Sequence, residues 1–172
     1  ATFHGSESDY AAAWAARPLI GRHAPWVMPA LLVQPSVFAY AAAGRADHHI
    51  LILLTFVAAL GFVVRALIDP TDRRSALASG ALTGFGLWLS IEFALQAAML
   101  GGALVAAWAF CPPERVAARG GQWLGYSVAL AAVTLVALLA EQAPADWLRP
   151  EYDRISIVHV LAALLGALAT FA

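Results

Sequence analysis

The sequence predicts an all-α fold, a polytopic transmembrane helix bundle of about six short or broken spans. Hydrophobic residues make up 62% of the 172 and charged residues only 12%, with a mean hydropathy of +0.74. Soluble domains are about half apolar and about a quarter charged. The apolar residues also form long uncharged blocks of helical length, without the alternation of membrane strands. Because a bilayer core admits only helices or closed barrels, helices are predicted.

The chain is expected to divide into a polar N-terminal segment, residues 1–23, and a transmembrane helical bundle, residues 24–172. Within the polar segment, residues 10–16 can form a short interfacial helix that carries Trp14. The first apolar stretch, residues 24–43, contains prolines, and proline removes a helical hydrogen bond and clashes with the preceding turn. We therefore expect this span to be kinked or partly unwound.

The remaining apolar sequence is divided by polar turns at residues 69–74, 111–121 and 141–154, which leaves helices over 47–66, 75–110, 123–140 and 155–172. As one helix, residues 75–110 would be roughly 54 Å long, against a hydrocarbon core of roughly 30 Å. Glu92 lies near its centre, where a carboxylate costs roughly 3 kcal/mol on insertion scales. A break into two short helices at residues 90–93 removes both difficulties.

The distribution of arginine predicts the orientation of the bundle. With a break at residues 90–93, one side holds Arg17, Arg22, Arg65, Arg73, Arg74, Arg115 and Arg119, and the other holds Arg45, Arg149 and Arg154. The positive-inside rule then places both termini in the cytoplasm of a bacterium, with the chain in the inner membrane. The turns that carry Asp47, Glu92 and Asp153 share the outer face.

The charge and the cysteine content exclude other classes. A formal net charge of −1 lacks the basic excess of a nucleic-acid-binding protein, so membrane lipids are expected partners and nucleic acid is not. The single cysteine, Cys111, has no partner for an internal disulfide or a thiolate metal site.

A candidate metal site lies at residues 44–49, at the start of a predicted span. Asp47, His48 and His49 place a carboxylate beside two imidazoles, a combination that binds divalent cations. The alternative is structural: Asp47 caps the helix by accepting backbone N–H groups, and the histidines lie in the headgroup layer.

Three further polar positions have both a functional and a structural interpretation. Glu92 is an ionisable residue among apolar ones, which marks a site, or else it is a hairpin-tip glutamate that reaches water. His159 on an apolar helix is expected to be a hydrogen-bonded packing residue. Tyr152 belongs to a polar cluster before the last span. Gly80 and Gly84 have the spacing that allows close helix packing.

Three motifs carry a resemblance to a known family. They are residues 44–49 (GRADHH) at the start of a span, residues 88–92 (WLSIE) at the break, and residues 151–154 (EYDR) leading into 156–159 (SIVH). Together with the arginine-rich turn after the first motif, they resemble GT-C class polytopic membrane glycosyltransferases, and most closely the bacterial relatives of the oligosaccharyltransferase catalytic subunit. The resemblance covers roughly residues 20–172.

The resemblance implies sugar transfer from a polyprenyl-linked donor at the outer face of the inner membrane. The metal-holding role of the family then falls on Asp47 and His49, and less directly on His48, with Mg²⁺ or Mn²⁺ as the ion. Glu92, Arg45 and Tyr152 are the expected donor-binding residues. Histidine in the place of a second carboxylate lowers the negative charge offered to Mg²⁺, so the metal can also differ or be absent.

The family also has an essential acidic residue in its first outer loop, which is expected upstream of Ala1. Glu7 and Asp9 are not assigned that role, because their segment is placed in the cytoplasm. The chain is therefore expected to be part of a longer enzyme, or a relative that keeps the scaffold without the chemistry. The alternative function is a non-catalytic integral membrane subunit that scaffolds a larger membrane complex. Haem ligation by His49 and His159 is a third, less favoured hypothesis, which absorbance near the Soret region would test.

Overall fold

The computed structural model describes residues 7–32 and 49–171, and the described part is all-α. Its α-helices are α1 (Glu7–Ile20), α2 (Val27–Leu32), α4 (His49–Ile68), α5 (Arg73–Leu89), α6 (Ala94–Ala109), α7 (Val116–Glu141) and α8 (Ile157–Leu168). Within the described residues, three helical stretches are long and apolar enough to cross a membrane, namely His49–Ile68, Ile91–Ala109 and Pro113–Glu141. A shorter apolar helix covers Ile157–Phe171. These helices suggest a multi-pass membrane protein.

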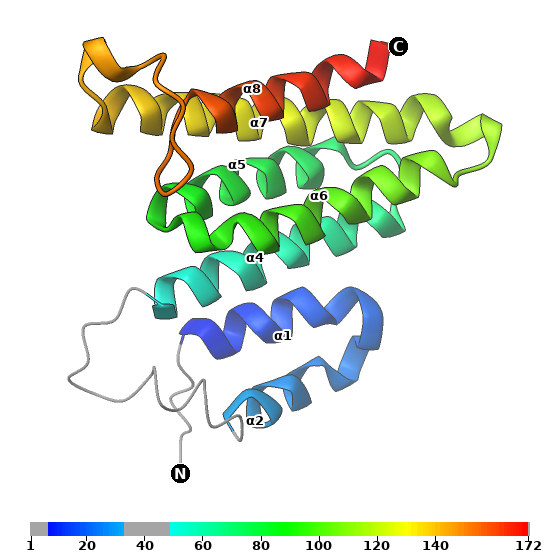
Figure 1. Cartoon of the computed structure of the whole chain (residues 1–172). Helices are drawn as coiled ribbons and strands as arrows, with labels where there is room; N and C mark the ends of the chain where they lie inside the picture. Colours follow the sequence, from blue (N-terminus) through cyan, green and yellow to red (C-terminus); the bar gives the residue numbers. More distant parts are fainter. Residues whose placement is uncertain (1–6, 33–48, 172) are drawn as a thin grey trace.

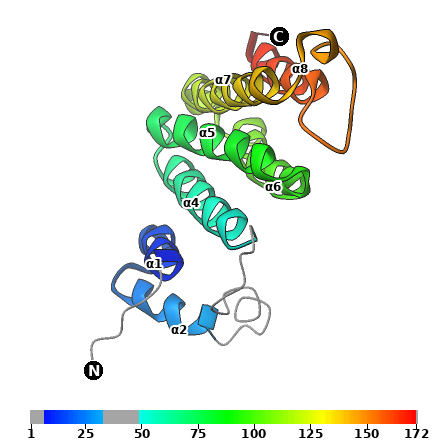
Figure 2. The ribbon, with the colours of Figure 1, turned by 90° about the vertical axis from the view of Figure 1, so that its left-hand side faces the viewer.

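The helices from α4 to α8 run up and down the bundle, so that each is antiparallel to the next (Figure 1). Helix α7 contacts α5, α6 and α8, and α5 in turn packs on α4. Helix α1 lies on the other side of α4, with α2 outermost (Figure 2). Every connection from α4 onward therefore lies at one of two ends of the bundle.

The predicted break in the apolar stretch 75–110 is present. Ser90 has an extended backbone and ends α5, and its Oγ accepts the N–H of Glu92 at 3.3 Å. A 3₁₀ turn, Ile91–Phe93, then leads into α6. Phe93 is fully buried, and a Cβ on Gly86 would collide with its ring. The turn is therefore held by packing as well as by the serine cap.

The expected close packing at Gly80 and Gly84 is confirmed, and it joins α5 to α7. A Cβ on Gly80 would collide with the backbone carbonyl of Tyr126. One on Gly84 would lie 2.8 Å from Cβ of Val133. In membranes, small residues at such crossings let the two helix backbones approach and increase their van der Waals contact.

The C-terminal end of α4 is capped by side chains from α7. Arg119 Nη1 and Nη2 donate to the carbonyls of Ala66 and Leu67, each at 2.8 Å. Gln122 Nε2 donates to the carbonyls of Ala66 and Asp69, each also at 2.8 Å, while its Oε1 accepts from Arg119 at 2.9 Å. Because the last carbonyls of a helix lack intrahelical partners, these bonds satisfy groups that would otherwise be buried unpaired.

This network explains where one sequence prediction was wrong. Residues 111–121 were expected to form a loop because of their prolines and glycine pair, but α7 already begins at Val116. A 3₁₀ turn, Pro113–Arg115, starts it. Helical structure from residue 116 is what brings Arg119 and Gln122 to the same face, three residues apart, against α4.

Other bounds differ more modestly. Helix α1 is longer than the expected residues 10–16, and α8 is a shorter α-helix than the expected 155–172, continued by the 3₁₀ turn Ala169–Phe171. The first apolar stretch begins with the 3₁₀ helix Gly21–Trp26 and α2, and the rest of it lies outside the described residues.

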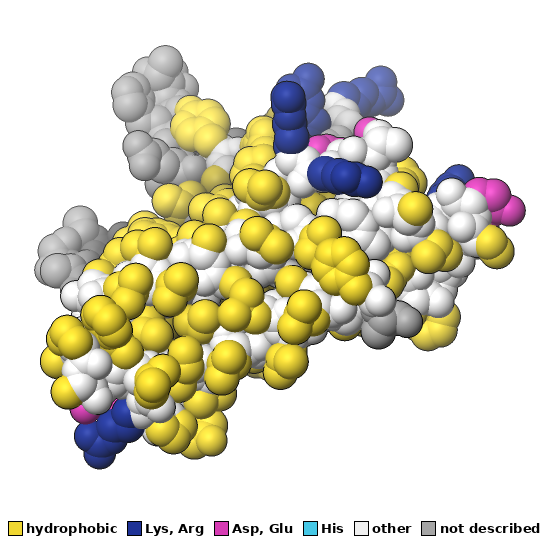
Figure 3. Space-filling model, turned by 90° about the horizontal axis from the view of Figure 1, so that it is seen from above, with side chains coloured by type: hydrophobic (Ala, Val, Ile, Leu, Met, Phe, Trp, Pro, Cys, Tyr) yellow, Lys and Arg dark blue, Asp and Glu magenta, His cyan; other side chains and the backbone are white. Residues whose placement is uncertain are grey.

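The two ends of the bundle differ in charge. We call the end that carries the α4–α5 and α6–α7 turns the basic end. Its described charges are three carboxylates and seven arginines, which include Arg17 in the last turn of α1 and Arg22 just after that helix. The opposite, acidic end carries the α5–α6 turn and loop 142–156, with two described arginines and five carboxylates. Apolar side chains cover the flank between the ends (Figure 3).

Candidate functional site

The acidic end brings together two of the residues that the sequence singled out. His49 is the first residue of α4, and Glu92 lies in the 3₁₀ turn between α5 and α6. Their Nε2 and Oε2 atoms are 3.9 Å apart, and the side chains are 38% and 73% exposed. An imidazole and a carboxylate from distant parts of the chain therefore face each other near the surface of this end.

The remaining residues of the candidate metal site, Asp47 and His48, and the predicted donor-binding residue Arg45, lie outside the described residues. Within residues 7–32 and 49–171, no three histidine, cysteine, aspartate or glutamate side chains are grouped closely enough to hold a metal ion. His49 and Glu92 offer one nitrogen and one carboxylate. The carboxylate suits a hard cation such as Mg²⁺ or Mn²⁺, whereas the imidazole suits Zn²⁺ better, so these two side chains alone do not select one metal.

Tyr152 lies in loop 142–156 and is 77% exposed. Its neighbour Glu151 pairs with Arg154, whose Nη2 donates to Oε1 at 2.8 Å, and Arg149 Nε lies 3.6 Å from the same oxygen. The hydrogen bonds from Arg154 lower the pKa of the Glu151 carboxyl, and the Arg149 charge adds to the effect. The loop therefore has its own charged cluster at the acidic end.

Glu141 is a further acidic residue of this end that the sequence analysis did not single out. It ends α7, and its Oε1 accepts the indole N–H of Trp88 from α5 at 2.6 Å. Trp88 precedes the 3₁₀ turn of Glu92 by only a few residues. The bond therefore ties the end of α7 to the turn that carries Glu92.

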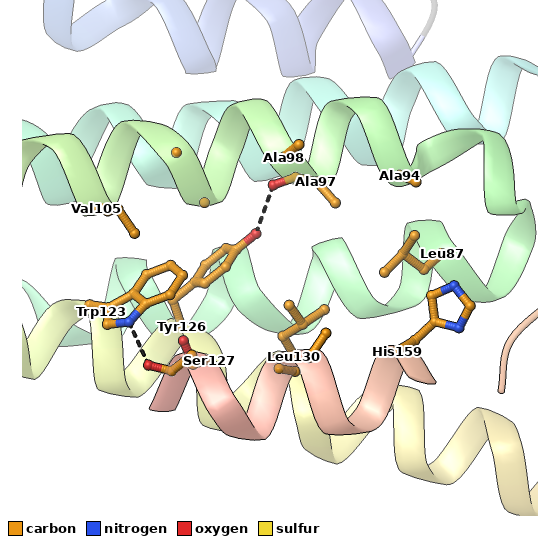
Figure 4. A pocket seen from close by; sticks show the side chains of 15 residues that line it. Leu87, Ala94, Ala97, Ala98, Val105, Trp123, Tyr126, Ser127, Leu130 and His159 are labelled. Atoms are coloured by element: carbon orange, nitrogen blue, oxygen red, sulfur yellow. Dashed lines mark hydrogen bonds between the residues drawn. The ribbon is translucent and has the colours of Figure 1, made fainter. Parts of the chain in front are cut away.

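An apolar groove of about 300 Å³ lies between α6, α7 and α8 (Figure 4). Small residues of α6 and α8 form its walls, among them Ala98, Gly102, Ala162 and Gly166. At one end it is lined by Ala94, the first residue of α6, which directly follows the 3₁₀ turn that carries Glu92. The groove therefore begins beside the acidic end and runs along the flank of the bundle.

The groove has few polar groups, and most of these already have partners. The indole N–H of Trp123 donates to the carbonyl of Gly166 at 2.6 Å, which joins α7 to α8. Tyr126 Oη lies 3.4 Å from the carbonyl of Ala97 (Figure 4). It also lies 3.3 Å from Thr83 Oγ1. Such a surface is suited to a hydrocarbon chain, which needs contact area and no hydrogen bonds.

His159 lines the same groove near its Ala94 end (Figure 4). Its Nδ1 accepts the backbone N–H of Ser156 at 3.2 Å, and together the two residues form a capping box at the start of α8. The expected hydrogen-bonded packing role of His159 is therefore confirmed. Haem ligation by His49 and His159 stays the less favoured hypothesis.

Comparison with protein-family models, curated proteins and solved structures finds no match. Fold and site geometry are therefore the observations on which a function can rest.

Proposed function

We propose that this protein is a membrane glycosyltransferase of GT-C type, or part of one, which uses a polyprenyl-linked sugar donor. The observation that carries the proposal is the apolar groove that ends beside the acidic end, where Glu92 faces His49. A polyprenyl-linked donor has an isoprenoid chain and a charged phosphate headgroup. The groove is suited to the chain and the polar end of the bundle to the headgroup.

The charge distribution supports a particular orientation. In the proposed topology, about six spans cross the bacterial inner membrane and both termini are cytoplasmic. The basic end, with its seven arginines, then faces the cytoplasm, as the positive-inside rule requires. The acidic end and the mouth of the groove face outward, where the donor headgroup would lie.

The proposed residue roles follow from this orientation. Asp47, His48 and His49 would hold a divalent cation, Mg²⁺ or Mn²⁺, which would neutralise the donor phosphate. Arg45 and Tyr152 would contact the donor headgroup. Glu92 lies opposite His49 and would orient that imidazole, since a carboxylate partner commonly fixes the ring of a ligating histidine.

The groove is tested by matched substitutions on α6. Ala98 lines the groove, whereas Ala106 is exposed on the same helix outside it. In nanodiscs, a diazirine-bearing polyprenyl phosphate should cross-link to α6 and α8, as mapped by mass spectrometry. Ala98→Leu should weaken its binding about tenfold, or about 1.4 kcal/mol, while Ala106→Leu should not. Equal cross-linking in both variants would contradict the proposed donor groove.

The chemistry is tested separately on the acidic end. Asp47→Asn and Glu92→Gln should retain cross-linking of the polyprenyl phosphate but abolish transfer of a radiolabelled sugar to endogenous acceptors in membranes. Because Glu92 is well exposed, its loss should leave thermal stability nearly unchanged. Donor binding without any transfer by the unmodified protein, with stable co-purification of larger subunits, would instead support a non-catalytic membrane subunit.

A further inference from the structure

A second hollow lies at the basic end, remote from the groove. It has a volume of about 410 Å³ and is lined by the end of α1 and the following 3₁₀ helix, including Trp14, Arg17, Gly21 and Arg22. Gly21 has a φ of 54°, which an L side chain rarely adopts. This residue allows the chain to turn sharply after α1, so that Arg17 and Arg22 border the same hollow.

The two arginines of this hollow are not neutralised by the rest of the described structure. Neither forms an ion pair with a carboxylate of residues 7–32 or 49–171. The nearby Arg65, in contrast, is engaged: it donates to the carbonyls of Gly61 and Trp14, and its guanidinium lies 3.6 Å from the centre of a Trp14 ring. Arg22 Nε donates to the neighbouring His23 Nε2, at 3.4 Å. The hollow thus offers two guanidinium groups without a carboxylate partner among the described residues, beside a third positive charge.

Exposed apolar side chains lie close to these charges in the sequence. Leu19 is 66% exposed and Trp26 is 73% exposed, on either side of Gly21 in the sequence. Tryptophan is enriched where membrane helices meet the headgroup layer, and arginine extends its charge to the same level. A ligand here would meet guanidinium groups and hydrocarbon together, which favours a lipid over a soluble anion.

We infer that this hollow binds the phosphate headgroup of an anionic membrane phospholipid. Guanidinium groups bind phosphate oxygens through paired N–H donors, and basic pockets between membrane helices are known to hold anionic lipid headgroups. Arg17 and Arg22 hold the phosphate, and the acyl chains lie along Leu19 and Trp26. The inference does not depend on the proposed glycosyltransferase activity, since α1 and the 3₁₀ helix after it form the hollow, whereas the groove lies between α6, α7 and α8.

The test is native mass spectrometry of the detergent-purified chain with phosphatidylglycerol or phosphatidylcholine of identical acyl chains. The unmodified protein should bind phosphatidylglycerol about tenfold more tightly. Arg17→Gln with Arg22→Gln should abolish this preference. The control pair Arg74→Gln with Arg115→Gln removes the same charge from exposed positions of the same end, outside the hollow, and should retain the preference.

Three results would overturn the inference. An equal loss of preference in both pairs would mean that the total charge of the basic end is what attracts the lipid. Displacement of phosphatidylglycerol by an equal concentration of inorganic phosphate would indicate a phosphate site instead. Arg17→Lys with Arg22→Lys gives a variant that keeps both charges for folding; it should lose the preference several-fold, because an ammonium cannot donate the paired N–H bonds. An unchanged preference in that variant would also contradict the proposed site.

Discussion

Gln122 and Arg119 are polar residues buried at the end of a candidate membrane span, and both are fully engaged. A buried polar group is costly mainly when it lacks a partner, so the effect of substitution depends on what is left behind. Here the groups left behind are carbonyls of α4 and of the turn after it. The two side chains therefore stabilise the fold through the neighbouring helix rather than through their own.

Two glutamines provide a matched test of this argument. Gln122→Leu should lower the free energy of unfolding by about 1–3 kcal/mol, because it removes buried hydrogen bonds to the carbonyls of Ala66 and Asp69 and the amide oxygen that accepts from Arg119. Gln96 has a buried Oε1 without a hydrogen-bond partner in the described part of the chain, so Gln96→Leu should be neutral or stabilising. Unfolding in mixed SDS micelles measures both. A similar loss in the two variants would show that glutamine volume, and not its bonding, matters.

The charged cluster of loop 142–156 should respond to acid. The pKa of Glu151 is lowered by hydrogen bonds from Arg154, so this carboxyl stays ionised at pH values where a free glutamate is protonated. Its contribution to loop order is therefore present above the ordinary glutamate pKa of about 4.3 and is lost as the pH falls through the lowered value. A ¹³C-carboxyl titration should show a midpoint below that of free glutamate.

Arg154→Gln should move this midpoint upward, toward the ordinary value, because it removes the largest cause of the shift. Arg115→Gln, at the basic end, should leave it in place. A midpoint that does not respond to Arg154→Gln would show that the ion pair is not maintained in solution.

At the scale of the elements, α5 and α7 are joined by a crossing that leaves no room for a side chain at Gly80. The obstacle there is the backbone carbonyl of Tyr126, which cannot change rotamer to make space. The helices themselves would have to separate. A substitution at Gly80 therefore tests how closely α5 and α7 pack, and not the packing of a single side chain.

Gly80→Ala should lower the free energy of unfolding by about 1–3 kcal/mol, although alanine favours a helix by about 1 kcal/mol where space allows. Gly102 on α6 gives the control, since a Cβ there would meet nothing within 4 Å. Gly102→Ala should be neutral or slightly stabilising in the same SDS titration. Equal effects at the two positions would contradict a tight α5–α7 crossing.

The elements also differ in how far the sequence predicts them. The break before Glu92 follows from local facts, namely a stretch too long for one span and a charge at its centre. The start of α7 cannot be predicted from local facts, because Gly120 and Gly121 suggest a loop. The hydrogen bonds that favour a helix there are made to residues about fifty positions earlier in the chain. The groove was missed for a similar reason. Its small residues are visible on α6 and α8 separately, but the sequence does not say that those faces meet.

At the scale of the whole molecule, the alternation of arginine-rich and arginine-poor turns predicted two ends of different charge, and the described arginines do separate in this way. The same alternation placed the start of α4 and the turn of Glu92 at one end, and His49 and Glu92 do lie close together there. The orientation of the two ends relative to the cytoplasm is the part that a labelling experiment can decide.

The chain has a single cysteine, Cys111, in the turn between α6 and α7 at the basic end. In intact spheroplasts, a membrane-impermeant maleimide should not label it until the membrane is permeabilised. Tyr152→Cys in a Cys111→Ser background should be labelled without permeabilisation, because the acidic end is expected to face outward. The reverse pattern would invert the proposed topology. Equal labelling of Cys111 and of the cysteine at position 152 without permeabilisation would show that the two positions lie on the same side, which would contradict a membrane crossing by α7.

The cap that α7 provides for α4 also bears on how the protein is made. A ribosome completes α4 and α5 before Arg119 and Gln122 exist, so the last carbonyls of α4 must remain hydrated during that interval. Unpaired carbonyls are costly in hydrocarbon, so we expect this end of α4 to stay in contact with water until α7 is in place. Insertion of α7 then replaces water with side-chain donors. The last turn of α4 is thus completed only by residues that the ribosome adds about fifty positions later.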